Sequence, residues 1–191
     1  MLFRSRHVQG PMIQTEGLHW FALRITYCRE LKVQKALEDK GIRTFVPMRS
    51  FREEKGGKVV RKTVPAINNL VFAYSDQQTL YAFMQSEGDA SMTRFIWDRV
   101  TRMPIIIPDK QMDDFIRVCE ASADEAVFLS ELNDQLRTGT RVRVVFGPLA
   151  GVEGRVVRIR KSRRILVEIP GVMAVAGTYV PVEYLELLSE E

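Results

Sequence analysis

The side chains suited to acid–base, nucleophilic or metal chemistry are few in this sequence and are spread along it. Its two histidines, His7 and His19, lie near the N-terminus, and its two cysteines, Cys28 and Cys119, are far apart in unlike contexts. Two histidines and two separated cysteines are too few to suggest a zinc site, so we expect ordinary thiols. No Gly-x-Ser-x-Gly, Walker or His-Glu-x-x-His motif occurs. The sequence therefore predicts no catalytic residue, no bound metal and no cofactor, and hence no enzyme.

Positive charge is the more promising chemistry, because lysine and arginine bind phosphates. The formal net charge is only +4, but it is unevenly distributed. Segments 1–48, 49–62 and 139–164 are basic, whereas 109–138 and 165–191 are acidic. This alternation indicates faces for different partners, although charge that only keeps a protein soluble would give the same pattern.

Two segments supply the candidate phosphate contacts. An amphipathic helix is expected over 29–40 and a basic β-hairpin over 49–62, with its turn at Gly56-Gly57. Basic side chains beside an aromatic ring suit a nucleic acid, while plain solvated charge would explain any one of them equally well. The candidate nucleic-acid contacts are Tyr27, Arg29, Lys32, Arg49, Arg52, Lys55, Lys58, Arg61 and Lys62.

The elements around these residues follow a strand and helix alternation. Apolar residues at every second position of 21–27 predict a half-buried strand, and Trp20 falls on its otherwise polar side with Arg24 and Thr26. A large apolar side chain there is a candidate partner contact, and the alternative is a core tryptophan under a loop. Further strands are expected at 42–47, 66–74, 94–100 and 105–107, and helices at 79–85 and from Asp109. This order predicts an α+β sandwich, a mixed, largely antiparallel sheet with helices packed on one face.

From Gly139 the pattern changes to short strands separated by glycines. Valine and isoleucine alternate with arginine in 141–144, 156–160 and 164–169, so each strand has one buried face. Glycines and a proline between Phe146 and Gly154 allow tight turns. About fifty residues of this kind predict a small closed β-barrel of the SH3-like type.

These patterns divide the chain into four expected regions. They are a flexible N-terminus at 1–17, an α/β domain at 18–122, an acidic linker at 123–138 and the barrel at 139–188, with the apolar 127–129 expected to dock. The longest apolar run is far shorter than the roughly 20 residues that cross a bilayer. We therefore expect a cytoplasmic monomer that does not enter membranes.

At this point the sequence resembles a known family. Residues 139–164, GTRVRVVFGPLAGVEGRVVRIRKSRR, resemble the KOW motif. The N-terminal run HWFALRITYCRE, GIRTFVP, a basic glycine-containing hairpin and VPAINNLVFAY resembles, in the same order, the N-terminal (NGN) domain of NusG-type transcription elongation factors. The segments HWFALRITYCRELK, TFVPMRS, INNLVF and PDKQMDDFI look most similar to UpxY-type paralogues, antiterminators of capsular polysaccharide operons. The family has Pro-Gly-Tyr before its third strand where this chain has 67–70, INNL, and this favours a specialised paralogue.

The resemblance implies partners and contact residues. Family members hold the clamp of the largest RNA polymerase subunit with the NGN domain and suppress pausing or premature termination. The positions matching that surface are Trp20, Arg24, Ile67, Asn69 and Leu70, with Tyr81 and Ala82 matching a loop that reaches the opposite lobe. In the barrel, Leu149, Val152 and Val156 match contacts to a small-subunit ribosomal protein or to termination factor Rho, and a specialised paralogue can lack the Rho contact. Recruitment by a DNA element or by leader RNA is equally open.

Two other functions remain open at the level of sequence. KOW barrels also occur in ribosomal proteins, so an RNA-binding or ribosome-associated protein that uses 155–164 is the main alternative. A purely structural adaptor is the third and predicts no effect on transcript elongation.

Overall fold

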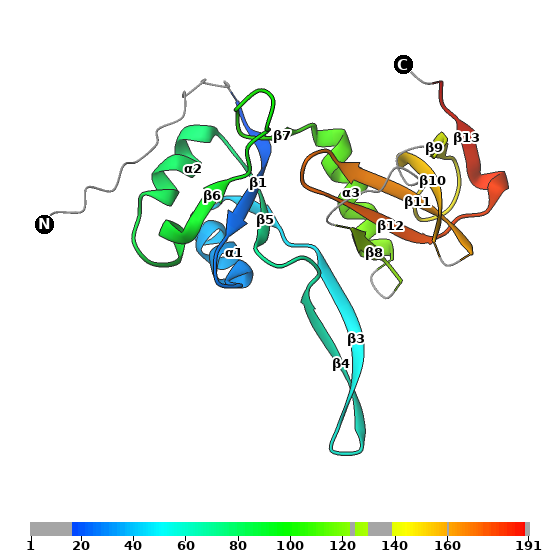
Figure 1. The fold of residues 1–191 in the computed structure, drawn as a ribbon, viewed down its shortest axis with the longest axis horizontal. Coiled ribbons are helices and arrows are strands. Elements are labelled where there is room, and N and C mark those ends of the chain that lie inside the picture. The colour runs from blue at the N-terminus through cyan, green and yellow to red at the C-terminus, as the bar shows by residue number, and fades with distance from the viewer. Residues whose placement is uncertain (1–16, 123–124, 130–138, 160, 190–191) are drawn as a thin grey trace, which may run out of the picture.

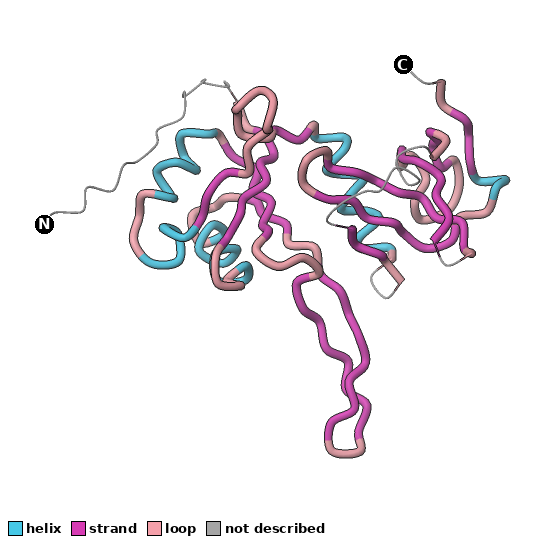
Figure 2. Tube along the Cα trace, viewed as in Figure 1, coloured by secondary structure: helices cyan, strands magenta, loops and turns pink. Residues whose placement is uncertain are grey.

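The computed structural model describes residues 17–122, 125–129, 139–159 and 161–189 (Figure 1). The expected flexible N-terminus therefore lies almost entirely outside the described residues. These residues form two antiparallel sheets, a projecting hairpin and three α-helices. Figure 2 shows how helices, strands and loops are distributed along the chain. This confirms the predicted α+β class with a β-rich C-terminal part.

The N-terminal sheet is built around β1. Its strand order is β2-β5-β1-β6, with β7 also pairing to β1, and every pairing among them is antiparallel. The bounds are β1 (His19–Ile25), β2 (Arg43–Phe45), β5 (Leu70–Ser75), β6 (Thr93–Phe95) and β7 (Ile106–Ile107). β1 buries side chains on both sides of the sheet, Phe21 and Leu23 on one side and Trp20 and Ala22 on the other, whereas Arg24 is exposed.

Helices cover both faces of this sheet, so the expectation of helices on one face is wrong. Phe21 and Leu23 pack against α1 (Glu30–Glu38) and α2 (Gln77–Met84), which is followed by a short 3-10 helix, η1 (Gly88–Met92). On the other face, Phe72 contacts Phe115 of α3 (Asp109–Ala121) edge to face, with ring centroids 5.6 Å apart. The order of elements predicted α3, but only the packing shows which face it covers.

A long hairpin projects from the N-terminal half (Figure 1). It pairs β3 (Met48–Lys55) with β4 (Lys58–Pro65) through the turn Gly56-Gly57, whose φ angles are 60° and 74°. Two successive positive φ angles suit the tight turns that match the twist of paired strands, and glycine adopts them at little cost. The predicted basic hairpin is confirmed.

The C-terminal sheet has six strands in the order β13-β9-β10-β11-β12-β8. Their bounds are β8 (Val127–Leu129), β9 (Arg141–Val144), β10 (Glu153–Ile159), β11 (Ser162–Ile169), β12 (Met173–Tyr179) and β13 (Leu185–Leu187), with a 3-10 turn, η2 (Val182–Tyr184), before the last. The expected linker thus contains a strand, because β8 pairs with β12. The domain boundaries themselves stay a prediction.

Helix α3 also packs on the C-terminal sheet. A Cβ built at Gly177 of β12 would lie 2.9 Å from Val118 and 3.0 Å from the Ser122 hydroxyl, so only glycine allows this close approach. One buried cluster runs from Trp20 and Phe72 through Phe115 of the helix to Ile165 of the C-terminal sheet. The two sheets therefore share a core with α3 between them.

Candidate functional site

A groove beside β1 brings together four of the seven predicted polymerase contacts. Arg24, Ile67, Asn69 and Leu70 line a cavity of about 660 Å³. Segment 96–99, with the partly exposed Trp97, forms a further part of its wall. Ile105, Leu129 and residues of segment 168–173, where β11 turns into β12, also line it. The groove is thus shared by the N-terminal half and the C-terminal sheet.

Asn69 has a structural role in the groove wall. Its φ angle is 64°, its side-chain carbonyl accepts a hydrogen bond from the Cys28 amide at 3.0 Å, and its own amide donates to the buried Glu30 carboxylate. Tyr27 and Cys28 also have positive φ angles. Asn69 therefore fixes the turn that leads from β1 into α1, and this contact presents the 67–70 loop beside Arg24.

Trp20 and Leu70 are core residues in this structure, so the expectation that Trp20 lies on a wet face is wrong. Trp20 is 1% exposed and Leu70 is 3% exposed. The Trp20 ring lies 5.4 Å from the Tyr74 ring, and the Arg43 guanidinium lies 5.0 Å from its centroid. The cause is α3, which covers this face of the sheet. The polymerase-contact role of Trp20 stays a prediction.

Tyr81 and Ala82 do not line the groove. Both belong to α2, where Ala82 is exposed and the half-buried Tyr81 packs its ring 5.1 Å from that of Phe95. Asp76 caps this helix by accepting from the Thr79 amide at 2.8 Å and from its hydroxyl at 2.7 Å. These hydrogen bonds, that of the hydroxyl foremost, hold the pKa of Asp76 below its usual range. Only Ala82 of this pair is freely accessible to a partner.

The hairpin carries most of the predicted nucleic-acid contacts on exposed positions. Arg52 lies directly opposite Arg61, and residues opposite one another in an antiparallel pair share a face. Lys62 is held by Glu53 at 3.8 Å and lies 6.0 Å from the centroid of the Phe51 ring. Arg49 and Lys58 are exposed, and the Lys55 side chain lies outside the described residues. The β3–β4 hairpin is therefore a basic, solvent-exposed ribbon that projects from the rest of the protein.

The remaining predicted nucleic-acid contacts lie at the start of α1. The Tyr27 ring is 78% exposed, and Lys32 is exposed. Arg29 forms an ion pair with Asp89 of η1, so part of its charge is already neutralised. Tyr27 and Lys32 are the accessible members of this group.

The predicted partner contacts of the C-terminal sheet pack in or against the buried cluster that includes α3. Leu149 is 4% exposed, Val152 is fully buried, and Val156 packs partly buried against the same cluster. Val156 was expected on an outward side with Arg158, and its packing against this core corrects that expectation. Whether these three residues contact a protein partner stays a prediction.

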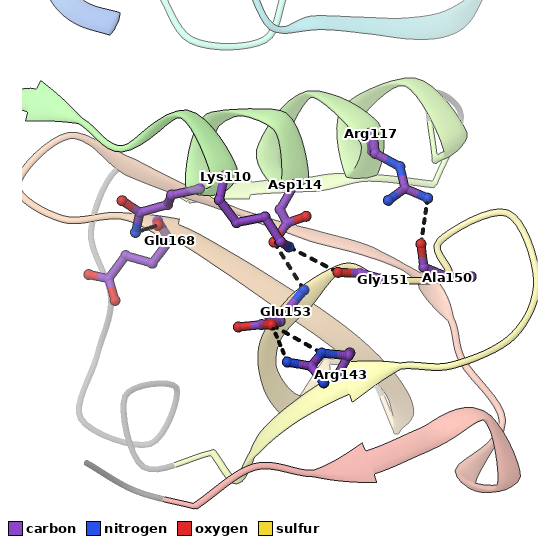
Figure 3. A network of polar contacts seen from close by, with 9 residues as sticks. Lys110, Asp114, Arg117, Arg143, Ala150, Gly151, Glu153 and Glu168 are labelled. Atoms are coloured by element: carbon purple, nitrogen blue, oxygen red, sulfur yellow. Dashed lines mark hydrogen bonds and ion pairs between the residues drawn. The ribbon is translucent and has the colours of Figure 1, made fainter. Parts of the chain in front are cut away.

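A polar network that the sequence did not predict joins α3 to the loop between β9 and β10 (Figure 3). Lys110 donates to the Gly151 carbonyl at 2.9 Å, and Arg117 donates to the carbonyls of Pro148 and Ala150 at 3.1 Å and 2.8 Å. The buried Asp114 carboxylate accepts from the Glu153 amide at 3.1 Å. Charged side chains are ordinary on a helix, so these residues give no sequence signal of a distant partner.

The network continues to the sheet surface through Glu153. Arg143 donates to the Glu153 carboxylate at 2.8 Å and to Glu186 at 3.4 Å. The hydrogen bond from Arg143 holds the pKa of Glu153 below its usual range, with the charge of Lys110 acting in the same direction. The described residues contain no group of three His, Cys, Asp or Glu side chains placed to hold a metal ion. Within the same residues, no helix is long and apolar enough to cross a membrane.

Comparison with known proteins identifies the N-terminal half. Residues 18–116, from the start of β1 into α3, match the family described as transcription termination factor NusG. No curated protein matches the chain. A solved structure described as "Domain interaction in Thermotoga maritima NusG" is similar at 16% sequence identity and a TM-score of 0.47, covering 91% of this chain and 98% of that chain. Because the family match spans more than half of the 191 residues, the chain belongs to the NusG family of transcription factors.

Proposed function

We propose that this protein is a transcription elongation factor that grips the largest-subunit clamp of RNA polymerase with the groove beside β1. The family generally binds RNA polymerase and is not enzymatic. The observation that carries the proposal is the convergence of Arg24, Ile67, Asn69 and Leu70 on one groove. The exposed cation of Arg24, a half-buried isoleucine and the Trp97 ring form the mixed apolar and charged surface that partner sites favour.

The same packing sets a condition on binding. Trp20 and Leu70 are buried against the shared core. They reach a partner only if α3 and the C-terminal sheet move away from this face. Arg24 and Ile67 are accessible without that movement and are the better residues to test.

Co-purification with RNA polymerase tests this surface. We expect the Arg24→Glu/Ile67→Asp variant to lose polymerase, because a reversed charge and a buried aspartate oppose docking. The matched control is Lys35→Glu/Leu31→Asp, which makes the same two changes at exposed positions of α1 and should retain polymerase. A groove variant with a native circular dichroism spectrum that still co-purifies would overturn the proposal.

We also propose that the β3–β4 hairpin, with Tyr27 and Lys32, contacts the nontemplate strand or upstream duplex. The support is the exposed basic ribbon, whose cross-strand Arg52–Arg61 pair concentrates positive charge on one face. Replacing both with glutamine should reduce the salt slope of bubble-DNA binding by about 1.4, since each contact to a single strand contributes about 0.7. Lys35→Gln/Lys40→Gln removes equal charge from exposed positions at the end of α1 and should leave the slope unchanged. An unaltered slope in the hairpin variant would refute DNA contact there.

We also propose a more specific function for this elongation factor, antitermination at a capsular polysaccharide operon. Its support is the resemblance of 67–70 and the neighbouring segments to UpxY-type paralogues. Leu149, Val152 and Val156 would then engage a small-subunit ribosomal protein, or Rho if that contact is retained. The test is elongation by purified polymerase on templates with and without the leader of such an operon. Read-through that is indifferent to the leader would argue against operon specificity.

A further inference from the structure

A second basic site lies on the C-terminal sheet, away from the groove and the hairpin. Arg158, Lys161, Ser162, Arg163 and Tyr179 line an open pocket of about 580 Å³. It is built at the turn between β10 and β11 and the end of β12. The lining contains three cations, two hydroxyl groups and an aromatic ring, with no carboxylate.

Two of these cations face each other without a counter-ion from the described chain. Arg158 pairs directly with Arg163 across the strands, so both side chains emerge on one face. Like charges in this position destabilise a sheet. Among the described residues, no ion pair reaches Arg158, Lys161 or Arg163. An anion between the two guanidinium groups would relieve the repulsion.

The aromatic ring distinguishes this pocket from a simple anion site. Tyr179 is 54% exposed although it ends a strand whose first five residues are buried. Exposed rings beside phosphate-binding cations stack on nucleobases. A duplex hides its bases within the stack, so a base reaches this ring only from a single strand.

We propose that this pocket binds single-stranded RNA. The Arg158–Arg163 pair takes one phosphate, Lys161 takes a neighbouring phosphate, and Tyr179 stacks on the base between them. The Ser162 hydroxyl lies in the same pocket and is suited to the ribose 2′-hydroxyl, which DNA lacks. The site does not depend on polymerase binding by the groove.

The test uses full-length protein and a fluorescein-labelled short oligouridylate, with binding followed by fluorescence anisotropy over a series of KCl concentrations. All variants carry Arg52→Gln and Arg61→Gln, so that the hairpin contributes little. In this background Arg158→Gln/Arg163→Gln should lower the salt slope by about 0.7, because the pair binds one phosphate, and Tyr179→Leu should weaken binding about fivefold or more. Lys35→Gln/Lys40→Gln, at exposed positions at the end of α1, is the charge-matched control and should bind as the background does.

Each outcome decides the proposal. The affected side chains lie at the surface, and circular dichroism of each variant verifies the fold. A slope that is unchanged without Arg158 and Arg163, or affinity that is unchanged without the Tyr179 ring, overturns the site. Equal affinity for the matching oligodeoxythymidylate overturns the assignment to RNA. Retention of polymerase by the Arg24→Glu/Ile67→Asp variant, which would overturn the proposed function, leaves all of these binding results unaffected.

Discussion

Asn69 connects local backbone geometry to the candidate polymerase surface. Asparagine tolerates the left-handed conformation better than most residues, and here its side chain also satisfies the Cys28 amide. The backbone amide of Asn69 donates to the Glu30 carboxylate and fixes the same turn from the helix side. Sequence comparison suggests a partner contact at this position, whereas the structure shows what the residue does for the fold.

Asn69→Ala should lower the free energy of unfolding by about 2 kcal/mol, since it removes a hydrogen bond and forces alanine into the left-handed region. Asn69→Gly loses the same hydrogen bond but adopts the conformation freely, so it should cost less. Urea denaturation of both variants measures the difference. Equal stability of the alanine variant and the wild type would contradict this role.

The two thiols should differ sharply in reactivity. Cys119 is 4% exposed, and burial, followed by the nearby Glu120 charge, raises the pKa of its thiol well above its usual range. Little thiolate therefore forms at neutral pH. A thiol-specific disulfide reagent should label Cys28, which is exposed, in the folded protein and both cysteines after denaturation. Rapid labelling of Cys119 in folded protein would show that α3 does not stay packed.

At the scale of elements, α3 is held by polar contacts as well as by apolar packing. Asp114 is the central residue of this network, because its buried carboxylate satisfies the Glu153 amide and pairs with Lys110. Periodicity predicted that α3 is amphipathic. It did not predict that polar residues of the helix bind a loop about forty positions away.

Asp114→Ala should destabilise the protein by about 1–3 kcal/mol, because the Glu153 amide loses its partner. Hydrogen exchange of that amide should accelerate as well. The control is Asp113→Ala, an exposed neighbour on α3 whose loss should change stability by less than about 0.5 kcal/mol. Equal effects of the two substitutions would rule out a specific contact.

At the scale of the whole molecule, the shared core predicts cooperative unfolding. One cluster of buried side chains includes both sheets and α3. Neither sheet can lose α3 without exposing apolar residues of its own. We therefore expect β5 and β11 to open together, although they belong to different halves of the sequence.

Native-state hydrogen exchange tests this cooperativity. The slowest amides of β5 and β11 should report the same opening free energy. Phe115→Ala should lower both by about 3–5 kcal/mol, because it removes a fully buried ring. Phe51→Ala, in the exposed hairpin, should leave both unchanged. A loss of protection in β5 alone would indicate two independent domains.

The sequence by itself determined the local elements and the fold class. The Gly56-Gly57 turn was predictable because a tight hairpin depends on residues next to one another, and β1 was predictable because its side chains alternate. The prediction that the Trp20 side of β1 faces solvent was wrong. Alternation indicates that Phe21 is buried, but it says nothing about what covers Trp20. The charge pattern identified the basic segments without showing which cations already have partners, as Arg29 does.

Only the tertiary structure decided how the halves meet. The burial of Trp20, Leu149 and Val152 follows from the position of α3 between the sheets. Pairing of β8 with β12 places a strand inside a segment that reads as a linker. The Arg158–Arg163 pair arises from strand register across a turn. Each depends on contacts between residues distant in the chain, and such contacts are set by the packing of whole elements rather than by local periodicity.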